Sequence, residues 1–196
     1  MTSSKLEILN DHYKDTFSHQ LGYLKRRNRF SFYLFLALVI MFLEVMSPSG
    51  TETIILKLIS KYLGNGISLE ASFVRCLIWL FLFGLVVQYY QTVVLVERQY
   101  AYLHKLEKDL IPFFSSQTPF TREGKSYLKN YPMLSNWNDI LYKWVFPAAL
   151  IFFTGVKLRI EFLNDGFNLV WIVSAVFCLM IWITTGIYLV SKIWEK

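Results

Sequence analysis

The stretch ASFVRCLIWLFLFGLVVQYYQTVVLV, Ala71 to Val96, decides the fold class of this chain. It is predominantly apolar and longer than the roughly 20 residues that a helix needs to cross about 30 Å of hydrocarbon. A segment in lipid must satisfy its backbone hydrogen bonds internally, which a helix does by itself and a lone strand does not. The stretch therefore predicts a membrane-spanning helix and an all-α protein.

Three further apolar segments flank this one, at Phe30 to Ser47, Ile140 to Val156 and Asn168 to Val190. Apolar residues make up 55% of the 196 residues and charged residues only 17%, whereas soluble domains carry about 25% charged residues. The mean hydropathy is +0.39. We therefore expect an integral membrane protein with four transmembrane helices, in contact with membrane lipid.

The basic residues predict how these helices are oriented. Fourteen Lys and Arg side chains lie before the first span, between the second and third, or after the fourth, and four lie in the two other loops. Basic residues gather on the cytoplasmic side, so both termini and the middle loop are expected there, in the cell inner membrane. A basic cluster next to the first span is either a plain anchor or a site for anionic lipid; it contains Lys25, Arg26, Arg27 and Arg29.

The same pattern divides the chain into five parts. We predict a cytoplasmic amphipathic segment at 1–29, a first transmembrane hairpin at 30–96, a cytoplasmic helical region at 97–139, a second hairpin at 140–191 and a tail at 192–196. The first hairpin includes a short amphipathic helix from Thr51 to Leu63, expected on the outer leaflet. The second includes a short external loop, 157–168, that turns at Asn164-Asp165-Gly166.

The second span is expected to continue into the cytoplasm. No Gly or Pro occurs between Leu85 and Ile111, so one helix is predicted from about Ser72 to Ile111, ended by Pro112. Its apolar stripe must be covered by the rest of the loop, by other subunits or by a matching stripe in residues 6–24. The stripe contains Val93, Val96, Tyr100, Leu103, Leu106 and Leu110.

Two kinds of polar residue lie inside the predicted spans. Glu44 and Arg75 fall at similar depths, so they either form an ion pair or snorkel independently to the interface. Gln88 and Gln91 share a helix face, where they could bond between subunits or line a wet cavity. Alternatively the membrane ends there, with Tyr89 and Tyr90 in an interfacial belt.

The sequence argues against an enzyme or a cofactor site. Gly124-Lys125-Ser126 resembles the end of a phosphate-binding loop, but Pro119 occupies the position of the first glycine. The histidines have no metal-site spacing, and no nucleophile elbow is present. Glu44 is expected to be a lone carboxylate within the membrane, which makes a transporter improbable.

The middle loop is the predicted docking surface for a cytosolic protein. Residues 97–139 contain six basic and five acidic side chains among aromatics, a mixture that suits a protein partner better than nucleic acid. The loop could instead pack against the membrane surface. The residues we select for docking are Arg122, Lys125, Tyr127, Tyr131 and Trp137.

The layout of VERQYAYLHKLEKDL, residues 96–110, and FTREGKSYLKNYPMLSNW, residues 120–137, between four spans resembles a known group of proteins. It is similar to the four-span membrane subunit of the Kiwa system, among the multi-pass proteins of bacterial antiviral operons. The resemblance implies a homo-oligomeric membrane sensor or anchor that works with a cytosolic effector, and it carries over no functional residue. A pore-forming effector that depolarises the cell is the alternative, and a small membrane enzyme or transporter ranks third.

Overall fold

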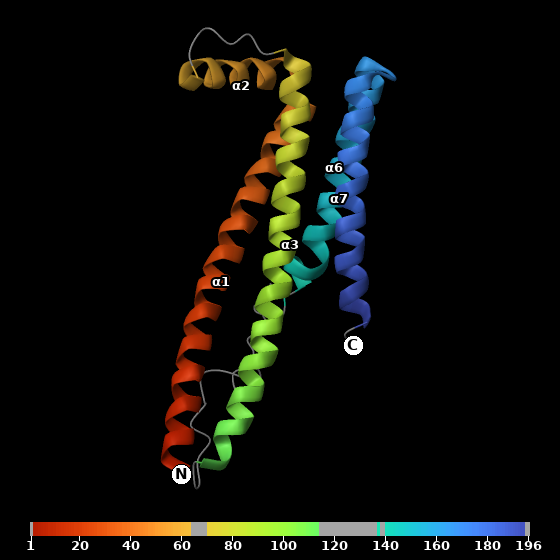
Figure 1. Cartoon of the computed structure of the whole chain (residues 1–196). Coiled ribbons are helices and arrows are strands. Elements are labelled where there is room, and N and C mark those ends of the chain that lie inside the picture. The colour runs from red at the N-terminus through yellow and green to blue at the C-terminus, as the bar shows by residue number, and fades with distance from the viewer. Residues whose placement is uncertain (1, 64–69, 114–136, 138–139, 195–196) are drawn as a thin grey trace. The chain divides into compact units, whose positions relative to one another are not determined.

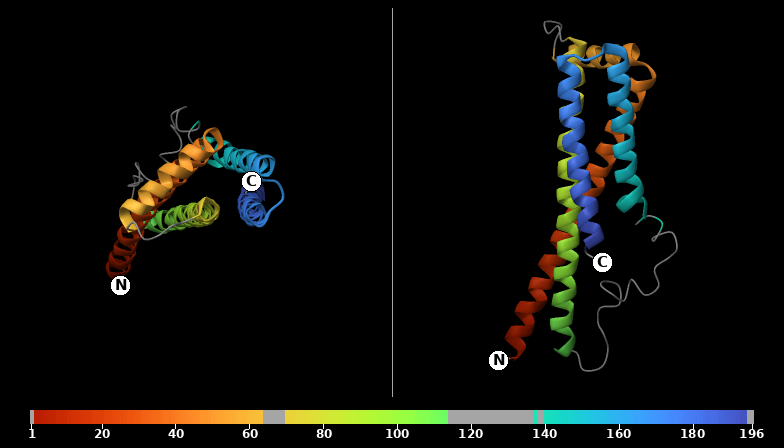
Figure 2. Two further views of the ribbon diagram at one scale, coloured as in Figure 1. Left: turned by 90° about the horizontal axis from the view of Figure 1, so that it is seen from above. Right: turned by 90° about the vertical axis from the view of Figure 1, so that its right-hand side faces the viewer.

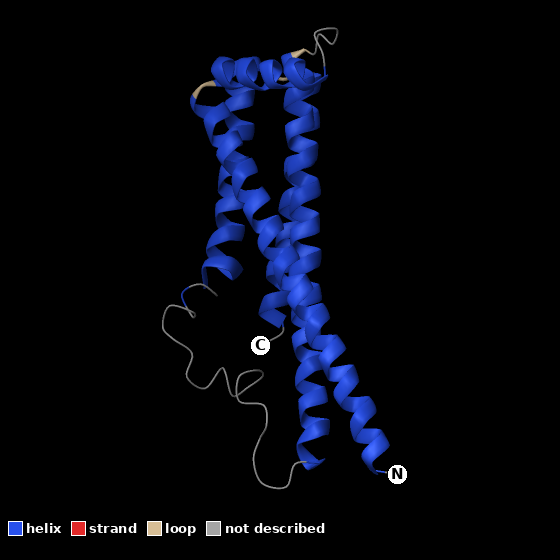
Figure 3. Cartoon of the chain, turned by 90° about the vertical axis from the view of Figure 1, so that its left-hand side faces the viewer, coloured by secondary structure: helices blue, strands red, loops and turns tan. Residues whose placement is uncertain are grey.

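The computed structural model describes residues 2–63, 70–113, 137 and 140–194. All of its elements are helical, as predicted (Figures 1 and 3). The α-helices are α1 (Thr2–Met46), α2 (Pro48–Leu63), α3 (Ala71–Leu110), α6 (Phe146–Asp165) and α7 (Leu169–Trp194), with a 3-10 turn η1 (Ile111–Phe113) and a π-helical turn η2 (Leu141–Val145).

Three helical segments within the described residues are long and apolar enough to cross a membrane: Leu6–Met46, Ser72–Phe113 and Leu169–Trp194. The sequence predicted four. The predicted third span, Ile140 to Val156, covers η2 and the first half of α6. The second half of α6 carries four charged residues. These charges set α6 apart from the other three helices, each of which contains an apolar stretch of span length with at most two charged residues.

Two of the predicted helices have nearly the predicted bounds in the structure. Helix α3 runs unbroken from Ala71 to Leu110, and the chain passes into a 3-10 turn at Pro112, whose ring removes a backbone N–H. The amphipathic helix predicted from Thr51 is present as α2, which begins at Pro48 and ends at Leu63. Helix α1 exceeds the prediction, because the N-terminal segment and the first span form one helix of 45 residues.

The chain divides into two compact units, one formed by Met1–Arg29 with Gln91–Asp139 and one by Phe30–Tyr90 with Ile140–Lys196. We call them the polar unit and the apolar unit. Helices α1 and α3 contribute residues to both.

The polar unit has a core of its own, formed where the two predicted stripes meet. Tyr13 of α1 packs with Leu103, Leu106 and Leu110 of α3, all at most 8% exposed. At the rim, His12 Nε2 and the Tyr102 hydroxyl are hydrogen-bonded at 2.7 Å. Partly buried apolar residues of α1 complete the cluster: Leu6, Leu9 and Phe17.

In the apolar unit, α6 and α7 form an antiparallel hairpin (Figure 2). The Trp182 indole N–H donates to Thr154 Oγ1 at 2.9 Å, and that of Trp171 donates to the Leu158 carbonyl at 3.2 Å. The buried face of α7 repeats at intervals of four and three residues, so it forms one stripe. It consists of Ser174, Cys178, Ile181, Thr185 and Tyr188.

The turn of this hairpin corrects one prediction. Residues 157–168 were expected to form a loop, but α6 continues to Asp165, and only Gly166 to Asn168 connect the helices. Gly166 has φ 68°, a left-handed conformation that glycine adopts without a Cβ clash. Asn168 Oδ1 accepts a bond from the Trp171 N–H at 2.8 Å, which caps α7. Lys157 and Arg159, counted above as loop residues, therefore lie on a helix.

Candidate functional site

A network of buried charges lies inside the apolar unit. The Lys157 ammonium is 2.8 Å from Glu44 Oε2 and 2.8 Å from Glu161 Oε1. The three side chains are between 3% and 7% exposed. One ammonium is therefore shared by two carboxylates away from water.

The helical periodicity of α6 places two of these residues on the inner face. Lys157 and Glu161 are one turn apart, and they continue a stripe whose other buried members are Pro147, Leu150 and Thr154. Residues at intervals of three and four share a helix face, so a helix that buries Leu150 and Thr154 also buries Lys157.

Trp79 joins α3 to the network. Its indole N–H donates to Glu161 Oε1 at 3.1 Å, and the side chain is fully buried. Glu161 Oε1 thus accepts from two donors, whereas Glu161 Oε2 is buried without a hydrogen-bond partner among the described residues. Residues of α1, α3 and α6 meet at this one point.

The hypothesis that Glu44 pairs with Arg75 is wrong, because each residue has a different partner. Glu44 pairs with Lys157, and Arg75 pairs with Asp165, at the end of α6. The sequence prediction failed because it assigned Lys157 and Asp165 to a loop, so only the first hairpin could supply partners. The Arg75–Asp165 pair is partly exposed, at 19% and 37%, which suits a site near the end of the bundle.

The expectation that Glu44 is a lone carboxylate is also wrong. Glu161 lies on the same ammonium and is buried to a similar degree. Ionisable residues in the interior of a helical membrane protein are costly and are commonly functional. The charge network therefore carries the strongest functional signal in the described part of the chain.

The helix-packing residues chosen from the sequence fall into different environments. Leu103, Leu106 and Leu110 are buried in the polar unit, but Tyr100 is 41% exposed. Gln88 and Gln91 are exposed as well.

The tyrosines between those glutamines do not form the interfacial belt considered above. Tyr89 and Tyr90 are buried, at 2% and 4%. Tyr90 stacks on Tyr188 of α7 with ring centroids 4.5 Å apart, and Tyr89 packs edge-on against Phe146. Both rings point into the helix bundle.

The predicted anchor and docking residues are only partly described. In the basic cluster, Lys25, Arg26 and Arg29 are exposed, while Arg27 is half-buried and bonds to Asn28 Oδ1. Trp137 is 55% exposed. The other docking residues, Arg122, Lys125, Tyr127 and Tyr131, lie outside the described residues.

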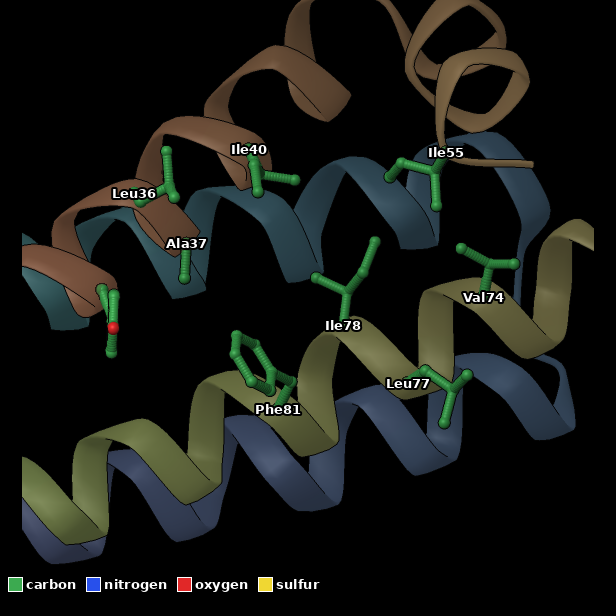
Figure 4. Close-up of a pocket in the computed structure, with 9 residues that line it drawn as sticks. Leu36, Ala37, Ile40, Ile55, Val74, Leu77, Ile78 and Phe81 are labelled. Atoms are coloured by element: carbon green, nitrogen blue, oxygen red, sulfur yellow. The ribbon is translucent and has the colours of Figure 1, made fainter. Parts of the chain in front are cut away.

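An apolar groove of about 280 Å³ opens in the apolar unit among α1, α2 and α3 (Figure 4). Its walls carry aliphatic and aromatic groups, so it suits an acyl chain or an apolar side chain rather than a polar ligand. The lining residues are Tyr33, Leu36, Ala37, Ile40, Ile55, Val74, Leu77, Ile78 and Phe81.

Replacing Trp79 with phenylalanine is expected to lower the free energy of unfolding by about 1.5–3 kcal/mol, because a hydrogen bond to a buried charged group is lost. Trp194, 86% exposed on α7, provides the matched control. Thermal unfolding in detergent would report the difference. Equal midpoints for Trp79→Phe and Trp194→Phe would show that the indole bond contributes nothing.

Among the described residues, no group of three His, Cys, Asp or Glu side chains could hold a metal ion. Comparison with known proteins gave no match to a family model, a curated protein or a solved structure. The functional argument therefore rests on the geometry described above.

Proposed function

We propose that the chain is an oligomeric anchor and sensor in the inner membrane that holds or triggers a cytosolic effector, in antiviral defence. The observation that carries this proposal is the length of two helices. α1 has 45 residues and α3 has 40, about twice what one crossing requires. The surplus residues form the core of the polar unit, which a plain membrane anchor does not need.

In this proposal α6 is the fourth crossing, and both termini and residues 97–139 are cytoplasmic. The helical segment from Leu141 to Asp165 is long enough for a crossing at 1.5 Å per residue. Three of the four charges in its second half are paired, Lys157 with Glu161 and Asp165 with Arg75. The fourth, Arg159, is exposed near the end of the helix, where a long arginine side chain can reach the interface.

The polar unit exposes apolar and aromatic side chains that a partner could cover. Ile8 is 67% exposed, and Tyr100 and Tyr102 are 41% and 42% exposed. Exposed aromatic residues frequently serve as anchors in protein interfaces. In the chain, the predicted docking residues follow Phe113, the last residue of η1.

The pore alternative has less support. Of the polar residues that could line a channel, Thr154 and Thr185 are fully buried. The Thr154 hydroxyl donates to the Leu150 carbonyl of its own helix and accepts from Trp182, so its bonding capacity is used within the hairpin.

Alanine at Arg122, Lys125, Tyr127 and Tyr131 tests the proposed function. Interface anchors contribute about 2 kcal/mol, so recovery of the effector with the tagged, detergent-purified chain should fall about 30-fold. The matched control carries alanine at basic and aromatic residues of α2, namely Lys57, Lys61 and Tyr62. Both variants should reach the membrane in equal amounts.

Equal recovery of the effector with both variants would contradict the docking assignment. Membrane potential on induction of the chain alone separates the two candidate functions. An anchor leaves the potential unchanged until the effector is present, and immediate depolarisation would favour the pore.

A further inference from the structure

We propose that Glu44, Lys157 and Glu161 form a proton-binding site, in which the two carboxylates share one exchangeable proton. The first argument is charge. Two carboxylates face one ammonium at 2.8 Å, so the fully ionised network carries one excess negative charge in a buried position. An uncompensated buried charge is strongly destabilising, and one bound proton removes it.

The surroundings do not cancel this excess. Apart from Lys157 and Glu161, the charged group within electrostatic range of Glu44 is Arg75, which pairs with Asp165. The thiols of Cys76 and Cys178 lie within electrostatic range of Glu161, but neutral thiols add no positive charge. The titratable and charged side chains of α3, α6 and α7 within electrostatic range of the two carboxylates are thus Arg75, Cys76, Lys157 and Cys178.

A proton fits this site better than a metal cation does. The Lys157 ammonium already occupies the position between the carboxylates, 2.8 Å from an oxygen of each. A sodium ion would have to displace it to reach both groups. A proton needs only one carboxylate oxygen and leaves the ammonium in its position between the two carboxylates.

The donors around each carboxylate indicate where the proton rests. Glu161 accepts from the Lys157 ammonium and the Trp79 indole, whereas Glu44 pairs with Lys157 alone. Donors favour the ionised form, so the proton resides mainly on Glu44.

Proton occupancy is therefore linked to helix packing in the apolar unit. With one proton the network is neutral, and it ties α6 to α1 through Lys157 and to α3 through Trp79. Loss of that proton restores the excess negative charge. A second proton leaves Lys157 without an anionic partner, so either change weakens the contact. The linkage between proton occupancy and helix packing does not depend on whether the polar unit docks an effector.

Infrared spectroscopy of the full chain in lipid nanodiscs tests the site, since a protonated carboxyl has a carbonyl band distinct from that of a carboxylate. At neutral pH the wild type should show one such band per chain, which shifts in heavy water and disappears at alkaline pH. Glu44→Gln and Glu161→Gln should each abolish it, because one carboxylate then balances one ammonium. Glu7→Gln, at an exposed position of α1, should leave it unchanged.

A wild-type spectrum without the band would overturn the proposal, and so would a band that survives in either single variant. Replacing choline with sodium in the buffer should leave the spectrum unchanged. Loss of the band on adding sodium would assign the site to a metal cation instead. The wild-type titration decides the question even if a variant fails to fold.

Discussion

Replacing Lys157 with methionine should lower the free energy of unfolding by about 3–5 kcal/mol, the largest effect expected in the apolar unit. Methionine keeps most of the side-chain volume but removes the cation that two buried carboxylates share. Breaking a buried ion pair leaves uncompensated charge, which is the main cost. Thermal unfolding of the detergent-purified chain, followed by loss of the monodisperse peak, would measure it.

Two further variants separate charge from packing. Lys61→Met changes an exposed lysine of α2 and should leave the unfolding midpoint nearly unchanged. The triple variant Lys157→Met with Glu44→Gln and Glu161→Gln removes the whole network, and neutral replacement of a buried ion cluster is often tolerated. It should therefore recover most of the loss. A triple variant as unstable as Lys157→Met alone would place the cost in packing.

Replacing Leu103 with alanine should destabilise the polar unit by about 2–5 kcal/mol, since it opens a cavity in a small core. Leu103 is 2% exposed and packs with Tyr13, Leu106 and Leu110. Hydrogen exchange by mass spectrometry should show faster exchange in residues 2–29 and 91–110.

Leu21 provides the control for this substitution, because it lies on α1 and is 44% exposed. Leu21→Ala should leave exchange in the polar unit at the wild-type level. In the Leu103 variant, peptides of α6 and α7 should also keep wild-type exchange, because they belong to the other unit. Unchanged exchange at residues 91–110 after Leu103→Ala would show that the cluster does not stabilise the unit.

The sequence predicted helices well wherever periodicity and chain breakers agree. The absence of Gly and Pro up to Ile111 and the breaker at Pro112 gave α3 nearly its observed bounds. The matching stripes predicted that Tyr13 and Leu103 belong to packing faces, and the structure brings them together. Such signals are local, so one sequence contains them.

The charge network was missed because its evidence is not local. Lys157 and Glu161 look like loop charges by composition, and only the helical spacing from Leu150 and Thr154 shows that they lie on a buried face. That spacing was present in the sequence. That spacing does not identify the partners of the α6 charges, Glu44 on α1 and Trp79 on α3, because the pairing depends on how the second hairpin packs.

The ion network also affects the order in which the chain can assemble. Within α6, Lys157 precedes Glu161, the less favourable order for an isolated helix because each charge faces the like pole of the helix dipole. This segment therefore depends on Glu44 and Trp79, both of which are made earlier during synthesis. By the time the ribosome releases α6, both residues have already been synthesised, so the contacts that stabilise its charges can form as soon as α6 packs against α1 and α3.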